Sequence, residues 1–160
     1  MKKLIIAIGL IVLVAVASIG VRAYMISRTV LRMNGNTMTP SYLDGDLLKI
    51  DYNATQLSRG DVVVFRLPSH PESVLVKRVI GMPGETVEIK DGKILIDSKV
   101  LNETGYFQNV PDTPNYAFTA MQLGGNDYFV LGDNRAQSFD SRSWGPLPAS
   151  NIAGVVVGRL

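Results

Sequence analysis

A hydroxyl residue and a lysine are the first candidates for chemistry in this chain. Thr37 lies in the turn sequence GNTMTP, and Lys77 interrupts the apolar run VLVKRVI. A lysine within an apolar strand either reaches solvent or loses its proton, because desolvation disfavours the charged ammonium. A neutral amine is a base, and a base within reach of a positioned hydroxyl is the minimal apparatus for acyl transfer without histidine. The two residues therefore predict a hydroxyl/amine pair with Thr37 as nucleophile.

A third stretch, GDNRAQSFDSRSWG, spans residues 132–145 and carries further polar groups. Each stretch by itself has an ordinary structural interpretation. The Thr37 hydroxyl can bond to its own backbone in a turn, and Lys77 can extend its amine from a strand to solvent. Asp140 and Arg142 can form a surface ion pair of little energetic value. The occurrence of all three stretches in one short chain favours a catalytic site.

Other kinds of chemistry have few suitable residues. His70, the single histidine, lies in PSHPE, where we expect an exposed loop, and a Ser-His-Asp triad could be assembled only through it. The chain has no cysteine, which excludes disulfides, thiolate zinc sites and a cysteine nucleophile. We predict neither a metal site nor a cofactor. The net charge of +2, without a basic stripe interleaved with aromatics, argues against a nucleic-acid partner.

Short apolar, β-branched runs must position these residues. From Leu47 onward, Gly, Pro and Asp divide the chain into such runs: LLKID, GDVVVFRLP, SVLVKRVIGMPG, TVEI, KILID, DYFVLGDN and IAGVVVGRL. This pattern predicts a β domain. KDG at residues 90–92 connects two alternating runs and predicts a hairpin. Between Val100 and Asp127 the chain is polar and irregular, and we interpret this stretch as a surface excursion.

The N-terminus has the composition of a membrane segment. Lys2 and Lys3 precede the uncharged run Leu4–Val21, close to the ~20 residues that a membrane helix needs. We expect an anchor over residues 1–24 and a β domain over residues 25–160. The A-x-A pattern at residues 15–17 also fits a cleavable signal peptide, so both alternatives stand. Positive charges flank the run on both sides, and the positive-inside rule does not decide its orientation.

The ordered motifs resemble the conserved boxes of type I signal peptidases, the membrane-bound Ser/Lys endopeptidases that remove signal peptides from exported proteins. Lysine at position 77, where eukaryotic and archaeal relatives carry histidine, points to the bacterial or organellar branch. The matching motifs are Thr37-Met38-Thr39-Pro40 with Gly45-Asp46, Gly60-Asp61-Val62-Val63, Lys77-Arg78-Val79-Ile80-Gly81 with Pro83-Gly84, and Gly132-Asp133-Asn134-Arg135 with Ser138, Asp140-Ser141-Arg142 and Gly145.

The resemblance implies a mainly β fold of coiled antiparallel sheets behind one retained N-terminal transmembrane helix. The short middle region, about residues 84–127, implies a small inserted subdomain of hairpin and loop. The implied location is the cell membrane, with a single pass, a cytoplasmic N-terminus and the catalytic domain on the outer face. The implied partners are the lipid bilayer and the signal peptides of preproteins, cleaved after A-x-A-type sites.

The resemblance also assigns roles to single residues. Lys77 is the general base, Ser138 hydrogen-bonds and orients its amine, and Asp140 with Arg142 forms a supporting ion pair. Gly35 keeps the backbone open ahead of the nucleophile, and the backbone N–H of residue 37 helps to bind the oxyanion. Asn134 and Arg135 are structural neighbours. The residues expected to line shallow pockets for small side chains are Met33, Met38, Tyr42 and Val76.

Thr37 departs from the family pattern, which has serine there. Threonine keeps the hydroxyl, and its extra methyl restricts χ1 near the scissile carbonyl. We interpret Thr37 as the nucleophile. The rival interpretation is a catalytically silent membrane module that binds secretory substrates or partners. An SOS-repressor-like autopeptidase shares the dyad logic, but it calls for an N-terminal DNA-binding unit where this chain has an apolar segment.

Overall fold

The computed structural model describes residue 14 and residues 29–107, 111–114 and 118–160. Contacts divide the chain into two units, Met1–Val30 and Leu31–Leu160, and the second holds the β domain. Apart from Val14, the predicted membrane segment Leu4–Val21 and the A-x-A pattern within it lie outside the described residues. Within the described ranges, no helix has the length and apolar character needed to span a bilayer.

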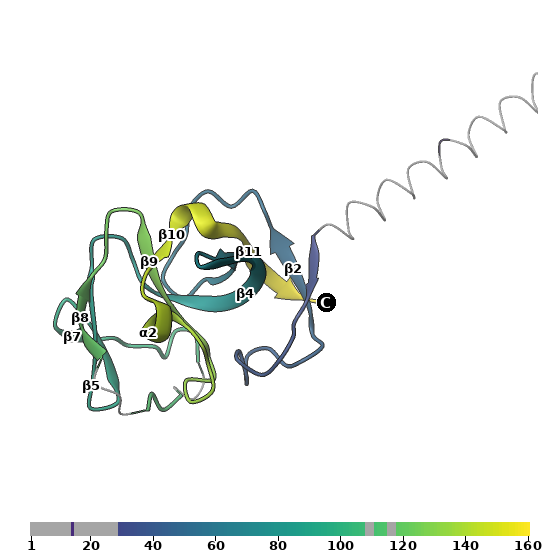
Figure 1. Cartoon of the computed structure of the whole chain (residues 1–160). Coiled ribbons are helices and arrows are strands. Elements are labelled where there is room, and N and C mark those ends of the chain that lie inside the picture. The colour runs from purple at the N-terminus through teal and green to yellow at the C-terminus, as the bar shows by residue number, and fades with distance from the viewer. Residues whose placement is uncertain (1–13, 15–28, 108–110, 115–117) are drawn as a thin grey trace, which may run out of the picture. The chain divides into compact units, whose positions relative to one another are not determined.

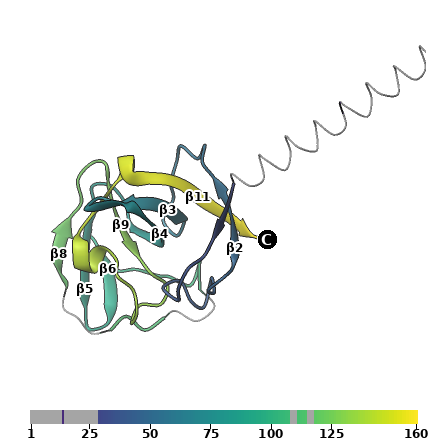
Figure 2. The same ribbon diagram turned by 45° about the vertical axis from the view of Figure 1, so that its right-hand side comes forward.

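The larger sheet has seven strands in the order β1-β2-β11-β3-β4-β9-β10. The pairs from β2 to β10 are all antiparallel, as the family resemblance implies. Figure 1 shows the end of β11 beside β2, and Figure 2 shows β11 running next to β3. The strands are β1 (Val30–Arg32), β2 (Leu47–Asp51), β3 (Val62–Leu67), β4 (His70–Gly81), β9 (Asp127–Leu131), β10 (Leu147–Pro148) and β11 (Ile152–Arg159). Two short helical turns, α2 (Ser141–Trp144) and η1 (Ala149–Asn151), flank β10.

A second antiparallel sheet has four strands in the order β7-β6-β5-β8. It contains the predicted hairpin, in which Lys90 of β5 pairs with Lys93 of β6 around a two-residue turn. Asp91 and Gly92 both have positive φ, 50° and 73°, as a primed hairpin turn requires. Figure 1 places this sheet to one side of the larger one. Its strands are β5 (Thr86–Lys90), β6 (Lys93–Ile96), β7 (Lys99–Val100) and β8 (Phe118–Gln122).

The interpretation of residues 100–127 as a surface excursion is wrong in two respects. Phe118–Gln122 forms β8, which pairs with β5 and has mostly exposed side chains. The preceding segment also buries Glu103, Phe107 and Thr113. Polar composition predicts exposure only when the polar groups bind water, and Glu103 and Thr113 hydrogen-bond within the protein instead.

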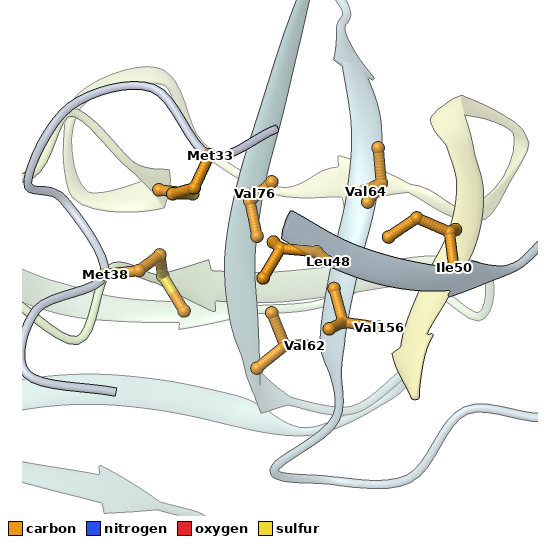
Figure 3. Close-up of a cluster of buried hydrophobic side chains, with 8 residues drawn as sticks. All are labelled: Met33, Met38, Leu48, Ile50, Val62, Val64, Val76 and Val156. Carbon is orange, nitrogen blue, oxygen red and sulfur yellow. The ribbon is translucent and has the colours of Figure 1, made fainter. Parts of the chain in front are cut away.

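The core of the larger sheet lies on both of its faces. In β3, Val62 and Val64 enter one apolar cluster, while Val63 and Phe65 enter another. This two-sided burial explains why β3 reads as a continuous apolar run rather than an alternating one. Figure 3 shows the first cluster, where side chains from β2, β3, β4 and β11 meet two methionines from the N-terminal loops. A third cluster joins the ends of β4 and β9 to the second sheet.

Candidate active site

Thr37 lies in a turn held mainly by hydrogen bonds. Gly35, which has a positive φ of 79°, donates its N–H to Asp44 Oδ1 at 2.7 Å. A Cβ on Gly35 would meet no atom of the described residues within 4 Å, so the positive φ, and not a lack of space, favours glycine at this position. The Thr39 hydroxyl donates to the carbonyl of Asn36 at 2.9 Å, and the peptide bond between Thr39 and Pro40 is cis. The turn presents the half-buried Thr37 toward β4.

The Lys77 amine meets the Thr37 hydroxyl, as the sequence predicts for a hydroxyl/amine pair. Lys77 is only 2% exposed, and its Nζ lies 3.1 Å from Thr37 Oγ1 and 3.0 Å from the carbonyl oxygen of Val76. Burial lowers the pKa of Lys77 to about 8, against the opposing charges of Asp140 and Asp133. A substantial fraction of the amine is therefore neutral near pH 8, and a neutral amine can accept the hydroxyl proton.

Gly132 marks the point where the third stretch touches the nucleophile turn. A Cβ on Gly132 would lie 2.2 Å from Ser138 Oγ and 2.5 Å from the carbonyl oxygen of Thr37. Only glycine fits between them. The Gly132 N–H donates to Asp140 Oδ2 at 3.1 Å. This one backbone position therefore contacts three predicted site residues.

Ser138 differs from its expected role. Its buried hydroxyl has no hydrogen-bond partner among the described residues, and the predicted bond to the Lys77 amine is absent. Lys77 instead uses the Val76 carbonyl and the Thr37 hydroxyl. A buried hydroxyl without a partner costs about 1–3 kcal/mol. Ser138 nevertheless lies beside the turn, because its oxygen and the Thr37 carbonyl oxygen both approach the same point over Gly132.

Asp140 and Arg142 form the predicted ion pair. Both guanidinium contacts, Arg142 Nε to Oδ1 and Nη2 to Oδ2, measure 2.8 Å, and the Asp140 side chain is fully buried. Asp140 also caps α2 by accepting the backbone N–H of Arg142 at 3.3 Å. Two-point geometry and burial distinguish this pair from the weak surface bridge that the sequence also allows.

Sequence reasoning missed a second ion pair next to the base. Arg78 donates to Asp133 through Nε at 2.8 Å and Nη2 at 2.6 Å, and both residues are buried. Asn134 has a larger part than that of a structural neighbour. Its backbone N–H donates to the Thr37 carbonyl at 3.1 Å, and its side-chain amide donates to the Asn36 carbonyl and Thr39 Oγ1. For the Arg78–Asp133 ion pair, the available signal in the sequence was an arginine directly after the lysine of an apolar strand, since a buried guanidinium requires a carboxylate.

A groove of about 220 Å³ opens beside the hydroxyl and the amine. Residues 31–34, residues 74–77 of β4, Thr37 and Phe139 line it. Met33 and Val76 are therefore where the pocket prediction places them. Met38 and Tyr42 are not among the lining residues. Met38 is fully buried in the core cluster of Figure 3, and Tyr42 packs against that cluster.

In β4, pairing with β9 begins only at Arg78, so among the described residues no strand pairs with the groove-side edge at residues 74–77.

Comparisons with known proteins identify the family to which the chain belongs. The family described as "Signal peptidase, peptidase S26" matches residues 1–160. A signal peptidase I of Leptolyngbya laminosa is 35% identical over 91% of this chain and 73% of its own length. Signal peptidase I V of Bacillus subtilis is 35% identical over 78% of this chain and 81% of its own. The crystal structure of a signal peptidase I from Enterococcus faecalis superposes with a TM-score of 0.52 and 31% identity, covering 66% of this chain and 100% of the other. The chain belongs to the signal peptidase family.

Proposed function

We propose that this protein is a membrane-bound endopeptidase that removes signal peptides from exported preproteins after A-x-A-type sites, with Thr37 as nucleophile and Lys77 as general base. The contact of 3.1 Å between the Lys77 amine and the Thr37 hydroxyl carries this proposal. Burial of the amine supports it, because a pKa of about 8 makes a neutral base available at moderately alkaline pH. Family membership supports the reaction class.

The chemistry follows from the pair. Lys77 Nζ takes the proton from Thr37 Oγ1 while the oxygen attacks the scissile carbonyl carbon. The backbone N–H of residue 37 stabilises the resulting oxyanion. The protonated amine then gives its proton to the leaving nitrogen of the mature protein, and an ester to Thr37 remains. Water, deprotonated by the same amine, hydrolyses this ester and restores the hydroxyl. Ser138 helps to hold the Lys77 ammonium that forms during each half-reaction, when its unpartnered hydroxyl gains a donor.

An extended substrate binds along the unpaired edge of β4. Backbone groups at residues 74–77 have no neighbouring strand on that side among the described residues, and an extended peptide adds to such an edge by main-chain hydrogen bonds. The groove next to Thr37 is small, about 220 Å³, which favours small side chains before the scissile bond. Val76 and Met33 provide apolar walls for them.

The proposed location is the cell membrane, with Leu4–Val21 retained as a single anchor, the N-terminus in the cytoplasm and the β domain (25–160) on the outer face. The uncharged length of this segment supports the anchor. Residues 84–127 form the proposed small subdomain, and the four strands of the second sheet fall within that range. Lipid and signal peptides are then the partners.

The decisive experiment incubates the detergent-solubilised protein with a preprotein that carries an A-x-A site. We expect one shorter product whose N-terminus follows the A-x-A residues. Thr37→Val keeps the branched shape but removes the oxygen, so no product should form. Thr37→Ser keeps the oxygen and frees χ1, so kcat should equal or exceed that of the parent while KM changes little. A parent and a Thr37→Ser variant that both leave the preprotein intact would overturn the peptidase proposal and favour the silent binding module.

A further inference from the structure

The middle segment, defined here as residues 102–107 and 111–114, contributes buried polar groups that the proposed mechanism does not use. Glu103 and Thr113 are 5% and 6% exposed. Both contact Arg135, which is 2% exposed and among the largest fully enclosed side chains. Arg135 Nη1 donates to Glu103 Oε2 at 3.1 Å and to Thr113 Oγ1 at 3.0 Å, and its Nη2 donates to Glu103 Oε1. A buried charge requires this degree of pairing.

Arg135 connects the middle segment to the point where the site residues meet. Its Nε donates to the Gly132 carbonyl at 3.1 Å. Gly132 in turn holds Asp140 through its N–H and lies directly under Ser138 and the Thr37 carbonyl. Arg135 therefore fixes the Gly132 backbone through its carbonyl, and the turn that carries Thr37 contacts the same residue.

Aromatic packing extends the same connection to the strand of the base. The Phe107 ring lies 4.9 Å from the Arg78 guanidinium carbon and 5.6 Å from that of Arg135. Tyr106 packs so closely on Gly60 that a Cβ there would approach its ring to 2.6 Å. Gly60 accepts a hydrogen bond from Arg78 Nη1 at 2.7 Å. The middle segment thus reaches both arginines that adjoin the catalytic residues.

We propose that Glu103 is a positioning residue for catalysis: through Arg135 it fixes the Gly132–Asn134 backbone against which the Thr37 turn is aligned. Asn134 transmits the alignment, since its N–H donates to the Thr37 carbonyl. Without Glu103 the guanidinium loses its counter-charge and two of the contacts that orient it, so its bond to the Gly132 carbonyl is no longer fixed in place. A misplacement of about 1 Å at a reacting group can cost about 100-fold in rate. The inference rests on the proposed peptidase function for its kinetic readout.

The first test substitutes Glu103→Gln, which preserves shape and removes the charge. Glu88→Gln, in β5 of the second sheet, is the matched control. Preprotein cleavage is measured well below the melting temperature of each variant. We expect kcat to fall at least about tenfold in Glu103→Gln with KM within about twofold, because Glu103 is not among the groove residues. The control should behave as the parent. A kcat equal to that of the control overturns the proposal.

A double variant separates positioning from simple charge burial. Glu103→Leu with Arg135→Met removes both buried charges, and such replacements are often neutral or stabilising. If the pair served stability alone, kcat would recover along with the melting temperature. Under our proposal the melting temperature recovers and kcat stays low, because no side chain holds the Gly132 carbonyl. Recovery of kcat in a folded double variant contradicts the proposal.

An activity-independent readout keeps the inference separate from the proposed function. The Asn134 amide proton, bonded to the Thr37 carbonyl, should exchange with solvent at least about tenfold faster in Glu103→Gln than in Glu88→Gln. If the parent cuts no preprotein, the peptidase proposal fails. The ratio of the Asn134 exchange rates in the two variants still tests the role of Glu103. An unchanged ratio refutes that role even in an active enzyme.

Discussion

The two halves of the hydroxyl/amine pair are held in different ways. Lys77 belongs to β4, which pairs with β3 between His70 and Arg78 and with β9 from Arg78 onward, and its flanking residues are buried. Thr37 belongs to a largely exposed turn outside the strands, held by hydrogen bonds to neighbouring loops. The base is thus part of the core, whereas the nucleophile depends on hydrogen bonds between loops and on its neighbour Met38, which packs in the core. Substitutions on the strand should change chemistry and stability together, and those at the turn should change mainly alignment.

Lys77→Met should have the largest effect and should act in opposite directions on activity and stability. Cleavage should disappear because no base remains. The folded-state pKa of Lys77, about 8, lies below the usual lysine value of 10.5, so the cost of burying the amine is fully present below pH 8 and vanishes as the pH approaches 10.5. At pH 7 the variant should gain up to roughly 3 kcal/mol of unfolding free energy, less the lost hydrogen bonds. Urea unfolding at pH 7 and pH 10 measures this gain, which should shrink at the higher pH. A variant that is less stable than the parent at pH 7 would contradict the assigned burial cost.

Asn134→Ala should have the next largest effect and should be confined to the turn. It removes the side-chain bonds to Asn36 and Thr39 but keeps the backbone bond to Thr37. We expect kcat to fall about tenfold while the melting temperature changes little, because a small misalignment costs rate more than stability. Asn126→Ala, at an exposed loop position, is the matched control. A large loss of stability with unchanged kcat would show that the turn belongs to the core as much as β4 does.

The smallest effect concerns the pH dependence of cleavage. Because only the neutral amine is a base, kcat/KM should rise with pH through about 8, the pKa of Lys77. The charge of Asp140 raises that pKa, so Asp140→Asn should shift the rise to lower pH. Arg142→Gln leaves the carboxylate without its partner, and the rise should move to higher pH. Profiles that shift in the same direction in both variants would exclude this electrostatic origin.

Local patterns predicted the strands and the residue types of the site better than they predicted its contacts. A few consecutive residues are enough to recognise the KDG turn, the alternating runs beside it and the apolar β3. Lys77 was recognisable because a charge in an apolar strand conflicts with its surroundings. Glu103 could not be recognised, since its partner Arg135 is 32 residues away and a lone glutamate in a polar stretch resembles any exposed one. Met38 was misplaced for a related reason: a methionine beside a nucleophile fits a pocket wall and a core equally well.

The unpaired edge of β4 has a consequence for the chemical reactivity of Lys77. A lysine buried between paired strands is normally exposed to reagents only when the domain unfolds globally. Here Lys77 lines a groove beside the edge at residues 74–77, and among the described residues no strand has to separate from that edge to open it. Small electrophiles that fit the groove should therefore acylate Lys77 in the intact protein, at a rate set by access and by the neutral fraction of the amine. Bulky reagents of the same intrinsic reactivity should have to wait for global unfolding, so the ratio of the two labelling rates would measure how wide the groove opens in solution.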